Sequence, residues 1–259
     1  MIKGFTKCVV ILSTLIVSGC ASATTCAQKN DNQEKVSALE SYNQVMFDVN
    51  HAIEKSVIRP VAKGYKAITN KFIRQRVTNF FNNIGEPVSA ANHILQGEPA
   101  NLGKNLSRFV INTTAGGLGL FDVATKWGVE AKPTGFDETL ATWCVPDGPF
   151  IVLPIIGPST PRAATGFAVD GYSSPIYWVA HENHGKDAMW AYYGATGLKY
   201  VNLMAENMEI LESLEEGSVD YYETIKSTYL QNRTKIGICG KTPDENSQSY
   251  DFDMDMDED

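Results

Sequence analysis

The sequence predicts a mainly α-helical protein with a single domain and one insertion rich in proline and glycine. Apolar residues recur at three- and four-residue spacing over most of the chain, which is the period of an amphipathic helix. Six prolines are concentrated between residues 128 and 162, which excludes a long helix there and favours a structured loop or hairpin. Of the 259 residues, 43% are hydrophobic and 20% are charged, so a wholly disordered or fibrous chain is excluded.

The beginning of the chain has the pattern of a secretory signal. Lys3 and Lys7 precede an apolar stretch at residues 8–17, which is too short to span ~30 Å of hydrocarbon as a stable helix. The stretch ends in the sequence VSGC at residues 17–20, where a branched apolar residue and two small residues precede a cysteine. This arrangement resembles the lipobox of bacterial lipoproteins, in which the cysteine is acylated and the chain is cut before it.

We therefore expect a lipoprotein signal peptide at residues 1–19, lipidation of Cys20 and a polar tether at residues 20–37. Ala21, which follows the cysteine, favours the outer membrane by the same resemblance. No later segment reaches the ~18 uninterrupted apolar residues of a membrane-spanning helix, so the lipid is expected to anchor the protein.

The helical domain is expected at residues 38–235, in short pieces bounded by proline and glycine. Pro60, Pro87 and Pro99 suit the first position of a helix, and Gly85 and Gly97 suit the position just after one. Residues 114–119 break the pattern, and residues 150–153 are expected to be extended. The expected helices cover residues 39–57, 60–68, 72–84, 87–96, 99–110, 120–127, 186–216 and 219–232.

The long helix at residues 186–216 is apolar over a wide arc, because it carries two stripes. In a membrane-anchored protein either stripe could face the core or lipid, and the sequence leaves both alternatives open. The first stripe is Met189, Tyr193, Thr196, Tyr200, Leu203, Asn207, Ile210 and Leu214, and the second is Val201, Met204, Met208 and Leu211.

The charge of the chain is concentrated at its end. The formal net charge is −8, and residues 244–259 contain eight acids and no lysine or arginine, so the rest of the chain is neutral. We expect residues 236–259 to form a disordered acidic tail that is solvated and limits nonspecific association. The chain lacks the basic patch of a nucleic-acid binder.

Three cysteines remain after the signal peptide and Cys20 are set aside, so at most one internal disulfide is expected. We favour Cys144–Cys239, because Cys26 lies in the expected tether. No pair has the CxxC spacing of a zinc or redox site.

Three candidate chemical sites have simpler interpretations. His181 and His184 lack a third metal ligand, so we expect no metal. The glycine-rich sequence at residues 116–119 lacks the features of a phosphate-binding loop and suits a tight turn between closely packed helices. Ser159, Thr160 and Asp170 could be drawn with a histidine as a catalytic triad, but no nucleophile elbow is present. We therefore expect neither a cofactor nor enzymatic activity.

Between residues 39 and 175 the sequence resembles the MlaA (VacJ) family of outer-membrane phospholipid-transport lipoproteins. Each matching piece is short, but their order and spacing agree across this range. The pieces include Arg59-Pro60-Val61-Ala62, Gly85-Glu86-Pro87, Leu95-Gln96-Gly97, Arg108-Phe109, Gly116-Gly117-Leu118-Gly119, Phe121-Asp122-Val123-Ala124, Gly148-Pro149-Phe150, Leu153-Pro154 and Gly157-Pro158-Ser159-Thr160 with Arg162.

The resemblance implies a ring-like single domain of short amphipathic helices in the inner leaflet of the outer membrane. It also implies an amphipathic channel that removes mislocalised phospholipids from the outer leaflet and so maintains lipid asymmetry. The implied partners are phospholipid, a trimeric porin and a periplasmic MlaC-like lipid carrier. Two alternatives are kept open. One is an envelope scaffold or adaptor that transports no lipid, and the other is a lipid hydrolase.

The resemblance also implies a gating hairpin between residues 136 and 150. The candidate gate residues are Phe136, Thr139, Leu140, Cys144, Pro146, Gly148, Pro149 and Phe150. The family's pattern has glycine where this chain has Asp137, Ala141, Cys144 and Pro146, which reduces the freedom of the backbone. It also has an Arg-Asp pair where this chain has Arg162-Ala163.

Arg108 and Arg162 are candidate contacts for lipid phosphate, since a guanidinium can bind phosphate with two hydrogen bonds. The alternative for both is a structural ion pair.

Overall fold

The computed structural model describes residues 28–182 and 186–239. The chain divides into two compact units, Met1–Ser41 and Tyr42–Asp259, and the architecture below is that of the second unit. The signal peptide, Cys20, Cys26 and the tail beyond residue 239 lie outside the described residues. Residues 28–37 were expected to be tether but belong to a helix, in a stretch that contains neither proline nor glycine to interrupt it.

The described residues form helices and one small antiparallel sheet. In chain order the elements are α2 (Gln28–Ile53), the π-helical turn η1 (Glu54–Ile58), α3 (Arg59–Ile68), α4 (Lys71–Gln96), α5 (Pro99–Thr114), α6 (Val123–Lys126), α7 (Phe136–Thr142), β1 (Ile151–Leu153), β2 (Gly157–Ser159), α8 (Pro161–Ser173), α9 (Pro175–Glu182), α10 (Lys186–Gly217) and α11 (Tyr221–Thr234).

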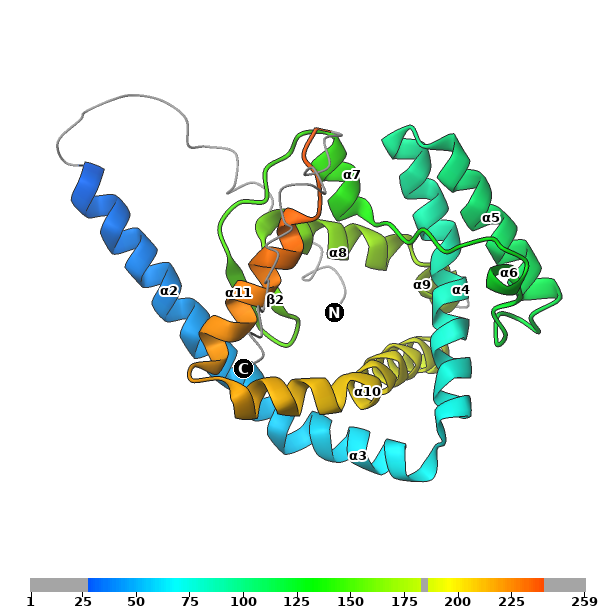
Figure 1. Ribbon diagram of the computed structural model, residues 1–259, viewed down its shortest axis with the longest axis horizontal. Coiled ribbons are helices and arrows are strands. Elements are labelled where there is room, and N and C mark those ends of the chain that lie inside the picture. Colours follow the sequence, from blue (N-terminus) through cyan, green and yellow to red (C-terminus); the bar gives the residue numbers. More distant parts are fainter. Residues whose placement is uncertain (1–27, 183–185, 240–259) are drawn as a thin grey trace, which may run out of the picture. The chain divides into compact units, whose positions relative to one another are not determined.

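The elements of the second unit form a closed circuit (Figure 1). Helix α4 packs along α5 and also contacts α7 and α10, and α10 contacts α3, α9 and α11. Helix α11 contacts β2, and α7 contacts α8, which leads on to α9. The predicted mainly α, ring-like fold is confirmed.

Local sequence signals set several helix ends. The side chain of Asn70 accepts a hydrogen bond from the backbone N–H of Ile73 and caps α4. Gly97 ends the same helix at φ +76°, a left-handed conformation that favours glycine. Pro99 lies in the first turn of α5. The predicted interruption before Pro60 is wrong, because Ile58 and Arg59 keep the helical conformation and the chain passes from η1 directly into α3.

The predicted break at Gly85 and Pro87 is wrong, because α4 runs through both residues without interruption. A proline inside a helix costs ~3 kcal/mol in isolation. Here α4 buries residues along its length against α5, α7 and α10, and these contacts offset the lost hydrogen bond. Local sequence signals cannot report such long-range packing.

The proline-rich insertion is more ordered than predicted. The expected extended segment is present as the hairpin of β1 and β2, in which Val152 pairs with Pro158. The insertion also contains α7, and it is followed by α8 and α9, which the pattern of apolar residues did not indicate.

The two stripes of α10 have different environments. Met204 and Met208 of the second stripe are buried with Ala205 against Ala62 of α3. From the first stripe, Tyr193, Leu203 and Ile210 remain exposed. The second stripe is therefore core, and these three residues of the first stripe are surface.

Glu215, near the end of α10, receives contacts from three cationic or titratable groups. Lys55 Nζ lies 2.5 Å from Oε1, Arg59 Nη1 lies 2.7 Å from Oε2, and His51 Nε2 lies 3.2 Å from Oε1. The hydrogen bond from Lys55, together with Arg59, lowers the pKa of Glu215 to about 2. The carboxylate is thus stabilised in its charged form.

We expect Glu215→Gln to lower the free energy of unfolding at pH 7 by about 1 kcal/mol, a value limited by solvent screening of the exposed Lys55. Because the folded pKa is depressed, this stabilisation is present above the ordinary pKa of 4.5 and is lost as pH falls towards 2. In urea titrations at pH 7, 5, 4 and 3, the free energy of unfolding should therefore decrease less with falling pH for the variant than for the wild type. Glu212→Gln, whose carboxylate contacts Lys63, is the matched control. If the free energy of unfolding of Glu215→Gln falls with pH as steeply as that of the wild type, the prediction is contradicted.

Candidate functional site

A cavity of about 370 Å³ lies between α4, α8, α9 and α10. This volume is near the lower end of the range for small-molecule sites. Its apolar lining is Phe81, Ile84, Val88, Phe167, Ile176 and Tyr192, and its polar lining is Ser89, Thr134, Asp170, Ser174, Thr196 and Lys199. Such a mixed lining suits an amphipathic molecule, because a polar group and a hydrocarbon chain can each find matching contacts.

Asp170 carries negative charge at this cavity and is held in place by two groups. Its carboxylate accepts hydrogen bonds from the backbone N–H of Phe136 at 2.9 Å and from Asn92 Nδ2 at 3.1 Å. Burial raises the pKa of Asp170 above its ordinary value, and the charge of Asp137 adds to this effect. The Asp170 carboxylate therefore takes up a proton at a higher pH than a surface aspartate does.

Thr139 connects the cavity wall to the candidate gate. Its side chain is fully buried, and its Oγ1 donates to Asn92 Oδ1 at 2.8 Å and accepts from Gln96 Nε2 at 2.9 Å. Asn92 and Gln96 both belong to α4, so the beginning of the gate segment is fixed to the helix that lines the cavity.

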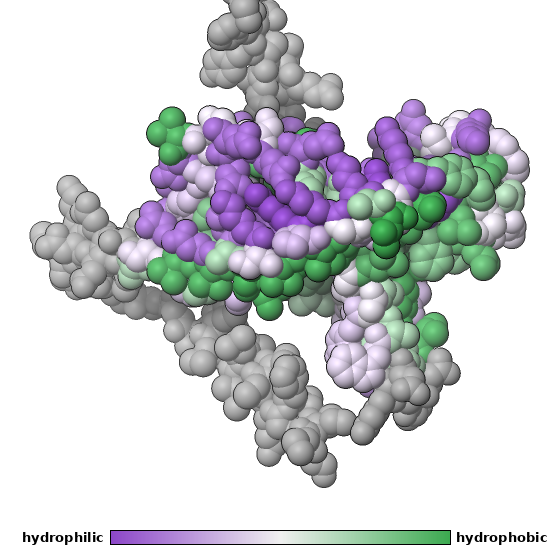
Figure 2. Space-filling view, turned by 90° about the horizontal axis from the view of Figure 1, so that it is seen from below, coloured by the Kyte–Doolittle hydropathy of each residue, from purple (hydrophilic) through white to green (hydrophobic). Residues whose placement is uncertain are grey.

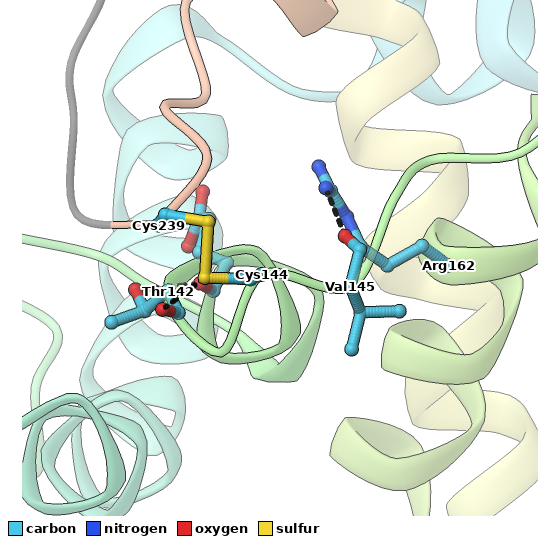
Figure 3. Close-up of a disulfide and its surroundings, with 6 residues drawn as sticks. Thr142, Cys144, Val145, Arg162 and Cys239 are labelled. Carbon is cyan, nitrogen blue, oxygen red and sulfur yellow. Dashed lines mark hydrogen bonds between the residues drawn. A yellow bond between two sulfur atoms is a disulfide. The ribbon is translucent and has the colours of Figure 1, made fainter.

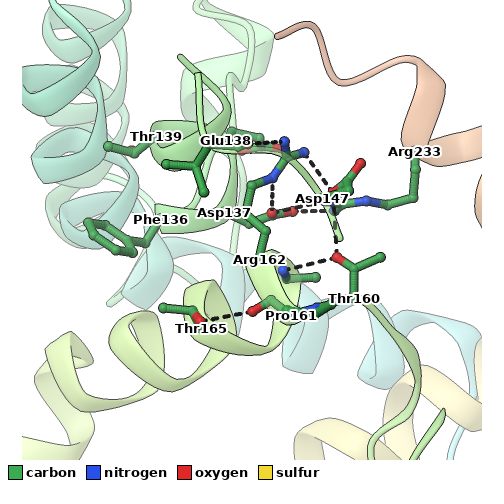
Figure 4. Close-up of polar contacts among 12 residues, drawn as sticks. Phe136, Asp137, Glu138, Thr139, Asp147, Thr160, Pro161, Arg162, Thr165 and Arg233 are labelled. Carbon is green, nitrogen blue, oxygen red and sulfur yellow. Dashed lines mark hydrogen bonds and ion pairs between the residues drawn. The ribbon is translucent and has the colours of Figure 1, made fainter. Parts of the chain in front are cut away.

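Four charged residues form an ion cluster that joins the beginning of the gate segment, at Asp137, to its later part, at Asp147 (Figure 4). The Arg162 cluster consists of Asp137, Asp147, Arg162 and Arg233. Arg162 is fully buried; its Nε donates to Asp137 Oδ1 at 2.9 Å, and its Nη2 lies 2.9 Å from Asp147 Oδ1. Arg233 of α11 contacts both aspartates. Burial alone would raise the pKa of Asp137, but the hydrogen bonds from Arg233 and Arg162 outweigh it and hold this pKa below its ordinary value.

A disulfide between Cys144 and Cys239 ties the loop after α7 to the residues after α11 (Figure 3). The two Cα atoms are 4.5 Å apart, and the backbone N–H of Cys239 donates to the carbonyl of Ala141 at 3.0 Å. The predicted pairing is confirmed. The disulfide connects Cys144 of the loop to the residues after α11, and the Arg162 cluster connects Asp147 of the loop to Arg233 of α11.

Two asparagines of α2 hold the free edge of the hairpin. Asn43 Nδ2 donates to the carbonyl of Phe150 at 3.0 Å, and Asn43 Oδ1 accepts from the N–H of Val152 at 2.8 Å. Asn50 makes the same pair of bonds with the carbonyl of Leu153, at 2.8 Å, and the N–H of Ile155, at 2.7 Å. Each side-chain amide thus takes the place of a neighbouring strand. The seven-residue spacing is visible in the sequence, but the partner strand is not.

Large hydrophobic side chains are exposed on many of the described helices. Ile68, Phe72, Ile94, Phe167 and Trp190 each expose more than half of their surface. Figure 2 shows hydrophobic residues gathered in a band along one side and hydrophilic residues on the other. Monomeric soluble proteins rarely expose a continuous apolar surface of this kind, so the band marks a contact with a membrane or a partner. None of the helices in the described residues has both the length and the hydropathy to cross a bilayer.

Comparison with known proteins decides the family. The sequence model of the family described as MlaA lipoprotein matches residues 37–236. The chain belongs to the MlaA lipoprotein family.

Individual MlaA-like proteins agree with this assignment. The Haemophilus influenzae protein named intermembrane phospholipid transport system lipoprotein MlaA is 34% identical over 228 residues, which cover 86% of each chain. A Rickettsia typhi protein is 39% identical over 145 residues, and the match spans 56% of this chain and 58% of that protein. A solved structure, reported as the structural basis for maintenance of bacterial outer membrane lipid asymmetry, matches with a TM-score of 0.61 at 27% identity. That match covers 76% of this chain and 97% of the other.

Arg108 and Arg162 are both buried in ion pairs in this MlaA-family protein. Arg108 Nε donates to Glu86 Oε1 at 2.7 Å, and its Nη2 donates to Asp122 Oδ2 at 3.1 Å. The structural alternative that the sequence left open is therefore the arrangement present, and in it neither guanidinium is accessible to a lipid phosphate. Two arginines that the sequence singled out stabilise the fold that surrounds the cavity.

The remaining gate candidates of the MlaA resemblance are distributed over α7 and the following loop. Phe136 and Leu140 lie in α7, whereas Pro146, Gly148 and Pro149 are exposed in the loop. Phe150 precedes β1, and its ring contacts Tyr222 and Tyr229 of α11.

Cys144 occupies a place where the family pattern has glycine, and its φ is +66°. This left-handed conformation favours glycine, so a cysteine that forms the disulfide occupies a backbone position that suits glycine.

Neither the candidate catalytic triad nor the histidine pair forms a chemical site among the described residues. Ser159 Oγ donates to the neighbouring carbonyl of Thr160, and the Asp170 carboxylate is occupied by Phe136 and Asn92, so these residues do not form a triad. His181 is in α9, His184 lies outside the described residues, and no group of three potential ligands in the described part of the chain is placed to hold a metal. The names of the MlaA relatives describe transport and no enzyme.

The sequence at residues 116–119 forms the predicted tight turn. A Cβ on Gly116 would collide with the backbone of Phe121 and Asn112, and a Cβ on Gly119 would lie 2.5 Å from Asn83 Cβ of α4. The glycines thus allow the turn to pack directly on α4 and α5.

Proposed function

We propose that the chain is an outer-membrane lipoprotein that removes mislocalised phospholipids from the outer leaflet and passes them to a periplasmic carrier. The observation that carries this proposal is the cavity with mixed polar and apolar lining between α4, α8, α9 and α10. Family membership and the names of the relatives support phospholipid as the molecule that is moved.

The proposed mechanism is passive. A phospholipid that crosses a bilayer must carry its charged head group through hydrocarbon, and this desolvation is the main barrier. Ser89, Thr134, Asp170 and Lys199 offer polar contacts on the path of the head group, while Phe81 and Phe167 offer apolar contacts to the chains. Lowering the barrier in this way needs no bond-making chemistry.

The anchor and partners complete the proposal. Acyl chains on Cys20 would hold the protein on the membrane, since each buried methylene contributes ~0.8 kcal/mol. The apolar band in Figure 2 is proposed to contact lipid and a trimeric porin. Residues 136–150 are proposed to gate the cavity, with their ends fixed by Thr139, the Arg162 cluster and the disulfide.

Gly85 gives a direct test, because it lines the cavity and has open space around the position of a Cβ. Gly85→Trp should fill the cavity without a backbone clash. In cells that lack their own MlaA, we expect wild type to restore low outer-leaflet phospholipid, read as palmitate transfer onto lipopolysaccharide. Gly85→Trp and Cys20→Ala should each leave the signal at the level of the deletion strain.

Gly103→Trp is the matched control, because Gly103 is a helical glycine of α5 with equally open surroundings and does not line the cavity. It should restore asymmetry like the wild type. If Gly85→Trp also restores asymmetry at equal protein level, the cavity is not the transport path and the scaffold alternative is favoured. Release of fatty acid that depends on Ser159 would favour the hydrolase alternative.

A further inference from the structure

Arg76 differs from the other arginines of the chain. The sequence has six arginines, and five of them lie within 4.0 Å of a carboxylate. These five are Arg59, Arg74, Arg108, Arg162 and Arg233. Among the described residues no carboxylate lies within this distance of Arg76, so its charge is available to a ligand.

The guanidinium of Arg76 instead lies against two aromatic rings. Its central carbon is 4.5 Å from the ring centroid of Phe72 and 4.5 Å from that of Phe121. Its Nε donates to the carbonyl of Phe72 at 3.4 Å. Among the described residues the Nη groups of Arg76 have no hydrogen-bond partner, and two such neighbouring N–H groups of a guanidinium bind phosphate through parallel hydrogen bonds.

The fold brings the two rings together from separate elements. Phe72 lies in the first turn of α4, and Phe121 follows the glycine-rich turn that packs on α4. Asn79 of α4 donates to the carbonyl of Leu120 at 3.1 Å and fixes this turn beside Arg76. The site is therefore built by tertiary contacts and is not a feature of a single helix end.

The surroundings of Arg76 are apolar and exposed. Phe72 and Phe121 expose 58% and 43% of their surfaces, and the neighbouring Ile73, Leu118 and Leu120 are exposed as well. Cationic side chains within such a surface are typical of the border between hydrocarbon and lipid head groups. The partner that matches both features has a phosphate and hydrocarbon chains.

We propose that Arg76, which lies against Phe72 and Phe121, binds the phosphate of a membrane phospholipid whose chains lie on the exposed rings. This lipid is bound at the surface of the protein and is separate from one that passes through the cavity. The inference rests on the membrane contact in the proposed function. It extends that function by naming Arg76 as the residue that positions the protein at the depth of the lipid head groups.

The test uses the full lipidated chain in a non-ionic detergent, titrated with lipid and observed by native mass spectrometry. Gly85→Trp serves as the background, so that the cavity does not contribute. Phosphatidylglycerol should bind about tenfold more weakly to Arg76→Gln than to the background protein. Arg76→Lys should fall between the two, because lysine keeps the charge but loses the planar geometry. Diacylglycerol, which has the same chains and no phosphate, should bind both proteins equally.

Lys104→Gln is the control for general charge, since Lys104 is an exposed cation of α5. It should bind phosphatidylglycerol like the background protein. If Arg76→Gln binds phosphatidylglycerol unchanged, or if Lys104→Gln loses as much affinity, the proposal fails. It also fails if inorganic phosphate binds as tightly as phosphatidylglycerol, because the chains would then contribute nothing.

The failures of the two proposals are distinguishable. Normal lipid asymmetry with Gly85→Trp would overturn transport through the cavity and leave the phosphatidylglycerol titration unaffected. Loss of the Arg76 effect would leave the result with Gly85→Trp unaffected.

Discussion

Replacing Arg162 with methionine is expected to lower the free energy of unfolding by about 3–5 kcal/mol. The side chain is fully buried, so its removal leaves Asp137 and Asp147 with Arg233 as their remaining cationic partner. It also leaves the carbonyl of Val145 without the hydrogen bond that Arg162 Nη1 donates at 2.9 Å. Urea titrations of the full chain, followed by circular dichroism, measure the loss.

Two further variants show whether buried charge causes the loss. Lys63→Met removes a cation whose pair with Glu212 is largely exposed, and it should cost at most about 1 kcal/mol. Adding Asp147→Asn to Arg162→Met removes one negative charge, so that Asp137 and Arg233 remain as a neutral pair, and it should recover part of the stability. If Arg162→Met costs no more than Lys63→Met, or if the double variant is the least stable of the three, the cluster does not act as described.

Removal of the disulfide is expected to lower the free energy of unfolding by about 2–4 kcal/mol. The bond joins residues that are 95 positions apart, so it restricts the unfolded chain over a long loop. Cys239→Ser should therefore be markedly less stable than the wild type under oxidising conditions. Addition of a reductant should destabilise the wild type towards the variant and leave the Cys144→Ser/Cys239→Ser double variant unchanged.

The choice of replacement at Cys144 separates the bond from the backbone. Because φ at this residue is +66°, Cys144→Gly loses the bridge but relieves the backbone, whereas Cys144→Ser loses the bridge and keeps the unfavourable conformation. We expect the glycine variant to be more stable than the serine variant by about 1 kcal/mol. Equal stability of the two variants would show that the loop changes its conformation once the bond is absent.

Both predictions bear on the proposed gate. The Arg162 cluster and the disulfide join the loop of residues 143–150 to α8 and α11. Variants that retain the fold but lack the disulfide should therefore have a more mobile loop.

Local sequence signals predicted much of the fold, because they depend on contacts between near neighbours in the chain. Gly97 at the end of α4, Pro99 at the start of α5 and the hairpin in the proline-rich insertion follow from backbone preferences. The continuation of α4 through Pro87 does not, because it depends on packing against α5, α7 and α10. Helix α7 is short and half-polar, and its position is fixed by Thr139, Asn92 and Gln96.

The candidate site was predicted less well, since charge pairing depends on residues that are distant in sequence. Arg108 and Arg162 have the same side chain as Arg76, and the sequence alone gives no reason to prefer one of them for a lipid phosphate. The positions of Glu86, Asp122, Asp137 and Asp147 decide which guanidinium groups are occupied.

By itself the sequence determined the helical class and the resemblance to the MlaA family, because each rests on a pattern along the chain. It favoured the pairing of Cys144 with Cys239 among three possible pairs, and the structure shows that bond. Only the tertiary structure decided which stripe of α10 is core, which arginine is unpaired and which residues line the cavity. The physical reason is that burial and ion pairing are properties of the closed circuit of helices. They arise when segments far apart in the chain meet.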